Sequence, residues 1–230
     1  MVTTWFVINL LRMRLNHYLS YMMKSLFFVL CVLTIPFICK AQDTNEITND
    51  KVKERIAQLR AQGADTIVCY YTDYSNCAGA TTVYNADTCI AYQPKYLIWK
   101  TAGQSYIQRF DECNTYAEGP VSSTFISTLS QNYKKVQKAT LKPVQYVQII
   151  KKRKFYTDVA VDYSCHTKLE VYTPSGVLVK DIDTFAADTK TYDGKNKNIY
   201  YKANQSSILV ALMKMANDLT GKTASTKKAP

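Results

Sequence analysis

The sequence predicts an α+β fold, an antiparallel sheet built from hairpins with about three helices packed on it. Two observations lead to this fold class. Short runs rich in β-branched and aromatic residues alternate with turn signals, which is typical of hairpins. Three longer stretches repeat apolar residues at the spacing of an α-helix. Because these elements follow one another as helix, strands, helix, strands and helix, we expect the helices on one face of the sheet.

Each predicted helix combines an apolar stripe with a start and a stop signal. In the first, Val52, Ile56 and Leu59 recur at helical spacing, while Lys51 and Arg55 belong to a basic face that we expect to be solvated. We expect residues 42–49, just before it, to be irregular. The predicted helices lie between Asn49 and Gly63, between Ser122 and Pro143, and between Asn204 and Gly221.

The predicted strands are joined by recognisable turns. Thr173-Pro174-Ser175-Gly176 gives the clearest hairpin signal, and Gly103 supports a second tight hairpin because glycine readily adopts a positive φ. The runs expected to form strands are 65–72, 96–100, 105–110, 144–150, 155–164, 169–172, 177–180 and 198–202.

Residues 23–41 have the three parts of a secretory signal peptide. Lys24 supplies the basic start, residues 26–38 form an apolar run of 13 residues, and the small residue Ala41 precedes the expected cleavage site at Gln42. The apolar run is shorter than the roughly 20 residues that a transmembrane helix needs. We therefore expect export through the secretory pathway, to the periplasm or the extracellular space.

This leader divides the chain into four predicted segments. Residues 1–22 are a non-native upstream extension or an extended start of the leader, 23–41 are the signal peptide, 42–221 are a single α+β domain, and 222–230 are a disordered tail. If the leader were not cut, its two apolar runs would make the protein a membrane-anchored accessory protein. Otherwise we expect membrane contact only through the leader.

The charge of the exported part favours an acidic partner. Removal of residues 1–41 takes away four of the 29 basic residues and none of the 18 acidic ones, which leaves a net charge of +7. The densest basic run is Lys151, Lys152, Arg153 and Lys154, although such a run also keeps an exposed strand soluble and unpaired. The partner is expected to be a protein or an acidic envelope polymer. Nucleic acid is not expected outside the cell.

Tyrosine is unusually frequent, with 18 in the chain. This side chain is enriched at protein interfaces and also suits β-sheets. If the pairs Tyr70-Tyr71 and Tyr200-Tyr201 lie on strands, each places one ring on each face of its strand. Tyr200 and Tyr201 therefore join the basic run as candidate binding residues.

Five cysteines follow the leader, and in an oxidising compartment they should form disulfides. With two bridges one thiol remains unpaired, and spacing alone leaves the connectivity open. A short ring between Cys77 and Cys89 is one possibility, and a bridge between Cys113 and Cys165 is another. The candidate disulfide cysteines are Cys69, Cys77, Cys89, Cys113 and Cys165.

The sequence contains no recognisable catalytic, cofactor or metal motif, so none of these sites is assigned. Adjacent residues of a strand point to opposite faces, which argues against a thiol–imidazole pair of Cys165 and His166. Asp181 and Asp183 are close enough to act as an acidic pair. We therefore expect a non-enzymatic, disulfide-stabilised binding domain, with a small secreted hydrolase using that pair as the alternative.

Overall fold

The structure is a computed structural model that describes residues 44–74, 77, 93–112, 114–161 and 164–223. Every described residue belongs to one compact unit, which lies within residues 43–230. The predicted signal peptide, its cleavage site at Ala41 and Gln42, and two of the cysteines, Cys89 and Cys113, lie outside the described residues.

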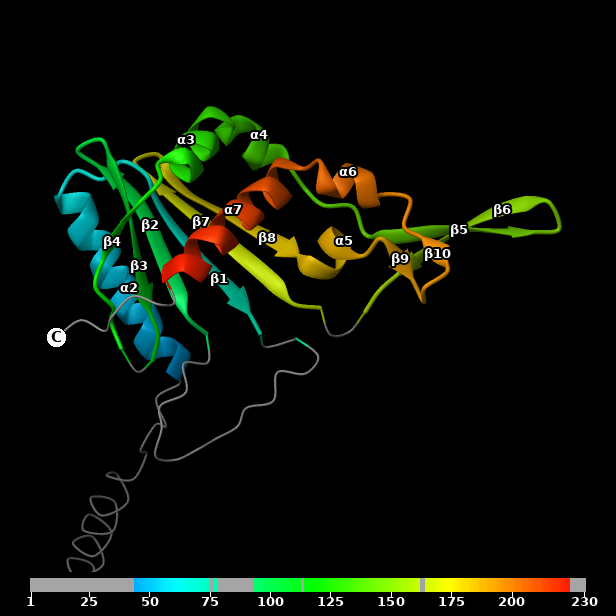
Figure 1. Ribbon diagram of the computed structural model, residues 1–230, viewed down its shortest axis with the longest axis horizontal. Coiled ribbons are helices and arrows are strands. Elements are labelled where there is room, and N and C mark those ends of the chain that lie inside the picture. Colours follow the sequence, from blue (N-terminus) through cyan, green and yellow to red (C-terminus); the bar gives the residue numbers. More distant parts are fainter. Residues whose placement is uncertain (1–43, 75–76, 78–92, 113, 162–163, 224–230) are drawn as a thin grey trace, which may run out of the picture. The chain divides into compact units, whose positions relative to one another are not determined.

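An antiparallel sheet of six strands dominates the described part of the chain, in the order β4-β3-β2-β1-β7-β8 (Figure 1). This confirms the predicted fold class. The predicted tight hairpins are also present, with positive φ at Gly103 between β2 and β3 and at Gly176, the first residue of β8 after the turn from β7. The strands are β1 (Ile67–Asp73), β2 (Lys95–Thr101), β3 (Gln104–Phe110), β4 (Gly119–Val121), β7 (His166–Thr173) and β8 (Gly176–Asp183).

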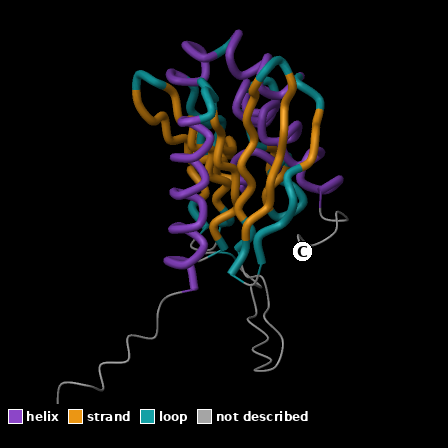
Figure 2. Tube along the Cα trace, turned by 90° about the vertical axis from the view of Figure 1, so that its left-hand side faces the viewer, coloured by secondary structure: helices purple, strands orange, loops and turns teal. Residues whose placement is uncertain are grey.

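Helices cover both faces of this sheet, so the prediction that they share one face is wrong (Figure 2). The reason is visible in β1, where Ile67 and Cys69 point to one face and Val68 and Tyr70 to the other, all of them buried. A strand that is apolar on both sides needs cover on both sides.

One face carries the helix α2 (Thr44–Ala61), and the other carries α3 (Thr124–Gln131), α4 (Tyr133–Lys138) and α7 (Ile208–Thr223). Residues 44–49, expected to be irregular, belong to α2. The basic face of α2 is also less solvated than expected. Lys51 donates to the carbonyl of Asp111 at 3.3 Å, and Arg55 donates to Gln108 at 3.0 Å. These basic side chains fasten the helix to the sheet.

The C-terminal region differs most from the prediction, because residues 198–202 form no strand. The side chain of Asn198 accepts hydrogen bonds from the backbone N–H groups of Gln145 and Tyr200, and this turns the chain into a short helix. The elements here are α5 (Thr184–Asp188), β9 (Thr191–Tyr192), β10 (Asn196–Lys197) and α6 (Tyr201–Gln205).

The sequence predicts that Asn204 or Ser206 opens the last helix, but neither does, and Asn204 has a different role. Its buried side-chain amide donates to the carbonyls of Lys142 and Ala186 at 2.8 and 2.9 Å. The helix α7 begins four residues later, at Ile208, and continues through Gly221 to Thr223. Asn204 therefore joins the segment that precedes residue 144 to α5 and α6.

Two strands stand apart from the six-stranded sheet. Among the described strands, β5 (Val144–Ile150) and β6 (Arg153–Val159) pair only with each other, and they extend away from the labelled helices and the main sheet (Figure 1). We call residues 144–159 the arm. The strand predicted at 144–150 is confirmed with the same limits, whereas the following strand begins earlier and ends earlier than the predicted 155–164.

Candidate functional site

The predicted basic run lies at the tip of the arm. Lys151 and Lys152 form the turn, and Arg153 and Lys154 begin β6. Both turn lysines have a positive φ, 48° and 63°, as a two-residue type I′ turn requires. Such turns strongly prefer Asn-Gly, because side chains are crowded in this backbone region. Four consecutive cations therefore occupy the exposed end of the hairpin.

Large apolar side chains next to these cations are also exposed. Ile149 is 70% exposed and Tyr156 is 63% exposed, and Ile150 and Phe155 are exposed as well. Residues opposite each other in an antiparallel pair share a face. The register therefore places Tyr156 opposite Val147 on one face of the arm and Phe155 opposite Gln148 on the other. Both faces of the arm thus present an aromatic ring beside cations.

The base of the arm, in contrast, is fixed to the rest of the domain. Val144 is buried, and the backbone N–H of Ile199 donates to the carbonyl of Gln145 at 2.8 Å. Tyr146 stacks on Tyr192 with ring centroids 6.1 Å apart. The arm is therefore held at one end, and its tip projects away from the described helices (Figure 1).

Tyr200 and Tyr201, the other predicted binding residues, lie at the base rather than at the tip. Neither is on a strand, and both are half-buried where α6 begins. Gln145, to which Ile199 is bonded, is five residues before the last residue of β5. At about 3.3 Å per residue, this separates the tyrosines from the turn by roughly 17 Å. The structure therefore does not join the two parts of the predicted binding surface.

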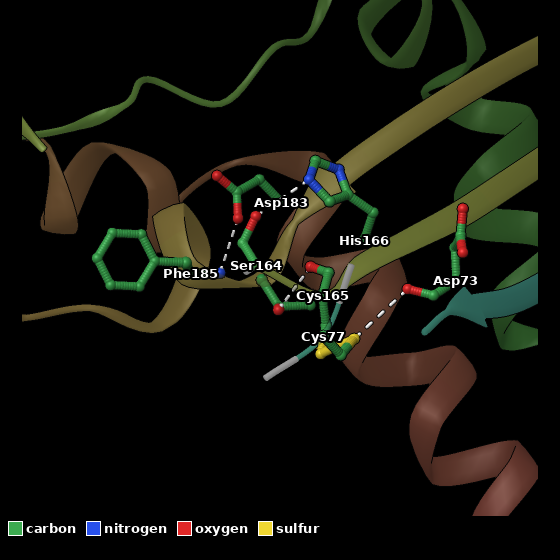
Figure 3. Close-up of a disulfide and its surroundings, with 8 residues drawn as sticks. Asp73, Cys77, Ser164, Cys165, His166, Asp183 and Phe185 are labelled. Atoms are coloured by element: carbon green, nitrogen blue, oxygen red, sulfur yellow. Dashed lines mark hydrogen bonds between the residues drawn. A yellow bond between two sulfur atoms is a disulfide. The ribbon is translucent and has the colours of Figure 1, made fainter. Parts of the chain in front are cut away.

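The disulfide links Cys77 with Cys165, 88 residues apart in sequence (Figure 3). The possible bridges Cys77–Cys89 and Cys113–Cys165 are therefore wrong. The expectation that Cys69 is disulfide-bonded is also wrong, since this thiol is free and buried under α2. Its place on β1 points it into the core, where burial raises the pKa of the thiol to about 12. Cys69 is therefore a small core residue in its protonated form.

The two aspartates of the alternative hydrolase hypothesis have different partners. Asp183 caps α5 by accepting a hydrogen bond from the backbone N–H of Phe185 at 2.9 Å. Asp181 contacts His166 Nδ1 at 2.7 Å and Lys168 Nζ at 2.5 Å. Because one carboxylate serves as a helix cap, the two do not form a matched acid and base pair.

Burial opposes ionisation of Asp181, but hydrogen bonds from Lys168 and His166 outweigh it and lower the pKa of this carboxyl. The other nitrogen of His166, Nε2, lies 3.1 Å from the hydroxyl of Ser164 (Figure 3). Sequence reasoning missed this contact. The spacing Ser-x-His was the available signal, since residues two apart in an extended chain share a side.

A second polar cluster lies on the face of the sheet that α2 covers in part. Glu170 accepts hydrogen bonds from the hydroxyls of Tyr71 and Tyr172, at 2.9 and 2.5 Å. Burial, and then the Glu170 carboxylate, raise the pKa of Tyr71 above its ordinary value, and the same two causes raise the pKa of Tyr172. As predicted, Tyr70 and Tyr71 point to opposite faces, but Tyr70 is buried. This cluster satisfies a half-buried carboxylate on the sheet.

Within the described ranges, no helix is long and apolar enough to span a bilayer, and no cluster of three or more acidic, histidine or cysteine side chains is placed to hold a metal ion. A pocket of about 410 Å³ lies beside the β7–β8 turn, where Arg60, Asp65, Thr173 and Val177 contribute to its lining. Neither predicted binding element lines this pocket.

No protein-family model, curated protein or solved structure matches the chain.

Proposed function

We propose that the protein is an exported, disulfide-stabilised binding protein that holds an acidic polymer of the cell envelope with its arm. The observation that carries the proposal is the exposure of four cations and four large apolar side chains on one projecting hairpin. Water-soluble proteins seldom expose so much apolar surface on one element unless a partner covers it.

The chemistry of the tip suits a polymer that carries both anionic groups and sugar rings. Arginine and lysine pair with carboxylate, sulfate or phosphate groups, and aromatic rings offer flat apolar surfaces for the carbon faces of sugars. Phe155 and Tyr156 are on opposite faces of the arm, so a flexible chain that wraps the hairpin contacts both. A single flat protein surface would cover only one of them.

The backbone of the turn supports the same proposal. A left-handed conformation costs an L-residue about 1–2 kcal/mol relative to the right-handed form, and two successive lysines adopt it here. Asn-Gly would form this turn more readily. The lysines therefore keep a backbone strain that Asn-Gly would relieve, and strain of this kind is a reason to look for a functional site at the turn. The lysines add positive charge at the point farthest from the base of the arm.

The leader and the disulfide support export. Residues 23–41 match the pattern of a secretory signal peptide, and the bridge between Cys77 and Cys165 is typical of proteins in oxidising compartments. An arm with a basic tip would there meet envelope polymers, many of which are acidic. This combination favours an envelope polymer over nucleic acid.

The test is a titration of the protein, purified after export, with heparin as a soluble acidic polysaccharide. In the tip variant, Lys151, Lys152, Arg153 and Lys154 are replaced by Gln. The control variant replaces four exposed lysines outside the arm by Gln and so removes the same charge, namely Lys134, Lys135, Lys138 and Lys142. Exposed ion pairs contribute about 0–1 kcal/mol each, so we expect the tip variant to bind about 10- to 100-fold more weakly and the control to change little.

Equal losses in the two variants, or no binding by the parent protein, would overturn the proposal. Two parallel titrations separate the alternatives, one with polyglutamate and one with phosphatidylglycerol vesicles. Tip-dependent binding to vesicles alone would identify a membrane partner, and tip-dependent binding to polyglutamate alone would identify an acidic protein. A change from Tyr156 to Ala should weaken heparin binding without altering its salt dependence, because the ring carries no charge.

A further inference from the structure

We propose that Ser164, His166 and Asp181 form a nucleophilic site for acyl transfer, which takes small carboxylic esters as substrates. This activity goes beyond the binding function proposed above and does not depend on it. The hydroxyl of Ser164 lies 3.1 Å from His166 Nε2, and His166 Nδ1 lies 2.7 Å from a carboxylate oxygen of Asp181 (Figure 3 shows Ser164 and His166). A hydroxyl, an imidazole and a carboxylate in this order are the parts of an activated serine.

The carboxylate determines which imidazole nitrogen carries the proton. An ionised carboxylate only accepts hydrogen bonds, so Nδ1 donates to Asp181 and the lone pair of Nε2 faces the hydroxyl of Ser164. Lys168 donates to the second carboxylate oxygen at 2.5 Å and favours the ionised form. His166 is thereby held in the tautomer that a general base needs.

The segment that carries the nucleophile and the base is fixed at its middle residue. Cys165 is bonded to Cys77, and its carbonyl accepts hydrogen bonds from the backbone N–H and the hydroxyl of Thr184 at 3.1 and 2.8 Å. Cys165 separates Ser164 from His166 by one position, so these bonds restrain both side chains. A pre-aligned hydroxyl and base do not have to be brought together at each reaction.

The site is also open to solvent. The His166 side chain is 34% exposed, and Ser164 and Cys165 are half-buried. The pocket beside the β7–β8 turn lies at the opposite end of these two strands, where Thr173 is opposite Gly176, whereas His166 is opposite Asp183. An open site of this kind favours an ester that is presented on an exposed group, with a small acyl part.

The reaction consists of two balanced steps. First, the oxygen of Ser164 forms a bond to the ester carbonyl carbon, the bond from that carbon to the leaving oxygen breaks, and His166 Nε2 moves the proton from the serine to the leaving alcohol. Second, water attacks the acyl-serine with the same imidazole as the base. This releases the carboxylic acid and restores the hydroxyl of Ser164.

The experiment measures covalent labelling by diisopropyl fluorophosphate and release of nitrophenolate from 4-nitrophenyl acetate. We expect one label on the folded protein, located on Ser164 by peptide mass analysis. The Ser164→Ala variant should take up no label. The matched control is Ser175→Ala, since Ser175 is an exposed serine whose hydroxyl contacts Thr173 and not an imidazole. This variant should react like the parent protein.

Two further variants test the base and its carboxylate. His166→Gln should react at least about 100-fold more slowly than the parent protein, because this change removes the general base. Asp181→Asn should also be slower, since an amide no longer selects the tautomer of His166.

An unlabelled parent protein, a label on another residue, or equal labelling of the urea-unfolded protein would each overturn the proposal. Urea midpoints of the variants show that a lost reaction is not a lost fold. Neutralising the arm tip should leave the labelling unchanged, so the two proposals fail or succeed separately.

Discussion

The arm and the six-stranded sheet are both antiparallel, but among the described residues helices cover the sheet and leave the tip of the arm exposed. In the sheet, Trp99 is 1% exposed and stacks on Tyr106 under α2. In the arm, Tyr156 is 63% exposed. An isolated two-stranded hairpin is only marginally stable in water, and its apolar side chains gain little from burial. The comparison teaches that similar strands differ in what covers them, and under the proposed function the arm leaves its apolar side chains exposed for a partner while the sheet buries them for stability.

The difference arises from the neighbours that each hairpin has in space. β1 pairs with β2 on one side and β7 on the other, so it has no free edge, and helices cover both its faces. β5 and β6 each have only one neighbouring strand in their sheet. Bonds at the base of the arm, such as that from Ile199 to Gln145, fix its origin but do not cover its tip.

The largest expected effect is on global stability. Trp99→Ala should lower the free energy of unfolding by about 3–5 kcal/mol, because it empties a large buried site between α2 and the sheet. Tyr156→Ala should change it by less than about 0.5 kcal/mol, since that ring is exposed. Urea denaturation of the two variants gives both values. A similar loss in both would mean that the arm tip belongs to the cooperative core.

A smaller effect of opposite sign is expected at the arm tip. The change Lys151→Asn with Lys152→Gly provides the residues that a type I′ turn prefers, so it should stabilise the arm against local opening by about 1–2 kcal/mol. Slower hydrogen exchange of the Ile150 and Arg153 amides measures this change. The same variant should bind heparin more weakly. Faster exchange would refute the interpretation that the lysines strain the turn.

The smallest expected effect is on the pH dependence of stability, and it comes from the thiol of Cys69. Burial raises the pKa of this thiol from 9.0 to about 12. Between these two pH values the folded protein keeps the thiol protonated, whereas the unfolded chain ionises it. The stability that this provides is fully present below about pH 9 and is lost as the pH rises towards 12. Burial raises the pKa of Tyr71 and Tyr172 too, with the same sign.

A comparison of the parent protein with Cys69→Ala tests whether the Cys69 thiol is buried and unreactive, which is the cause of its raised pKa. At pH 8 both folded proteins should show the same number of thiols that react with a disulfide reagent, and in urea the parent should show one more. Reaction of Cys69 in the folded parent would show that β1 opens readily and that the sheet is less well covered than its packing indicates.

Several features of the fold could be predicted from local sequence patterns alone. The strand at 144–150, the hairpins with Gly103 and Gly176, and the antiparallel α+β class rest on alternation and turn chemistry within a few residues. The basic run was visible for the same reason. These patterns act over distances that a short segment spans, so the sequence predicts them without knowledge of the rest of the fold.

Other features depended on contacts between distant segments. The pairing of Cys77 with Cys165 joins positions 88 residues apart, and the exposure of Tyr156 depends on which elements do not reach the arm. A turn at Asn198, whose side-chain oxygen accepts from the backbone N–H of Tyr200 just before α6, stands where a strand was predicted and outweighs the β preference of two tyrosines.

By itself, the sequence determined the fold class, the hairpins at Gly103 and Gly176, and the net charge of +7 of residues 42–230. Only the tertiary structure decided that helices cover both faces of the sheet, that Cys69 is a core thiol, and that Asp181 and Ser164 meet at His166. The physical reason is the separation along the chain over which each kind of interaction acts. Backbone preferences and turns act between neighbours in the chain, whereas burial, disulfide partners and a hydrogen-bonded trio require that strands such as β7 and β8 have already paired.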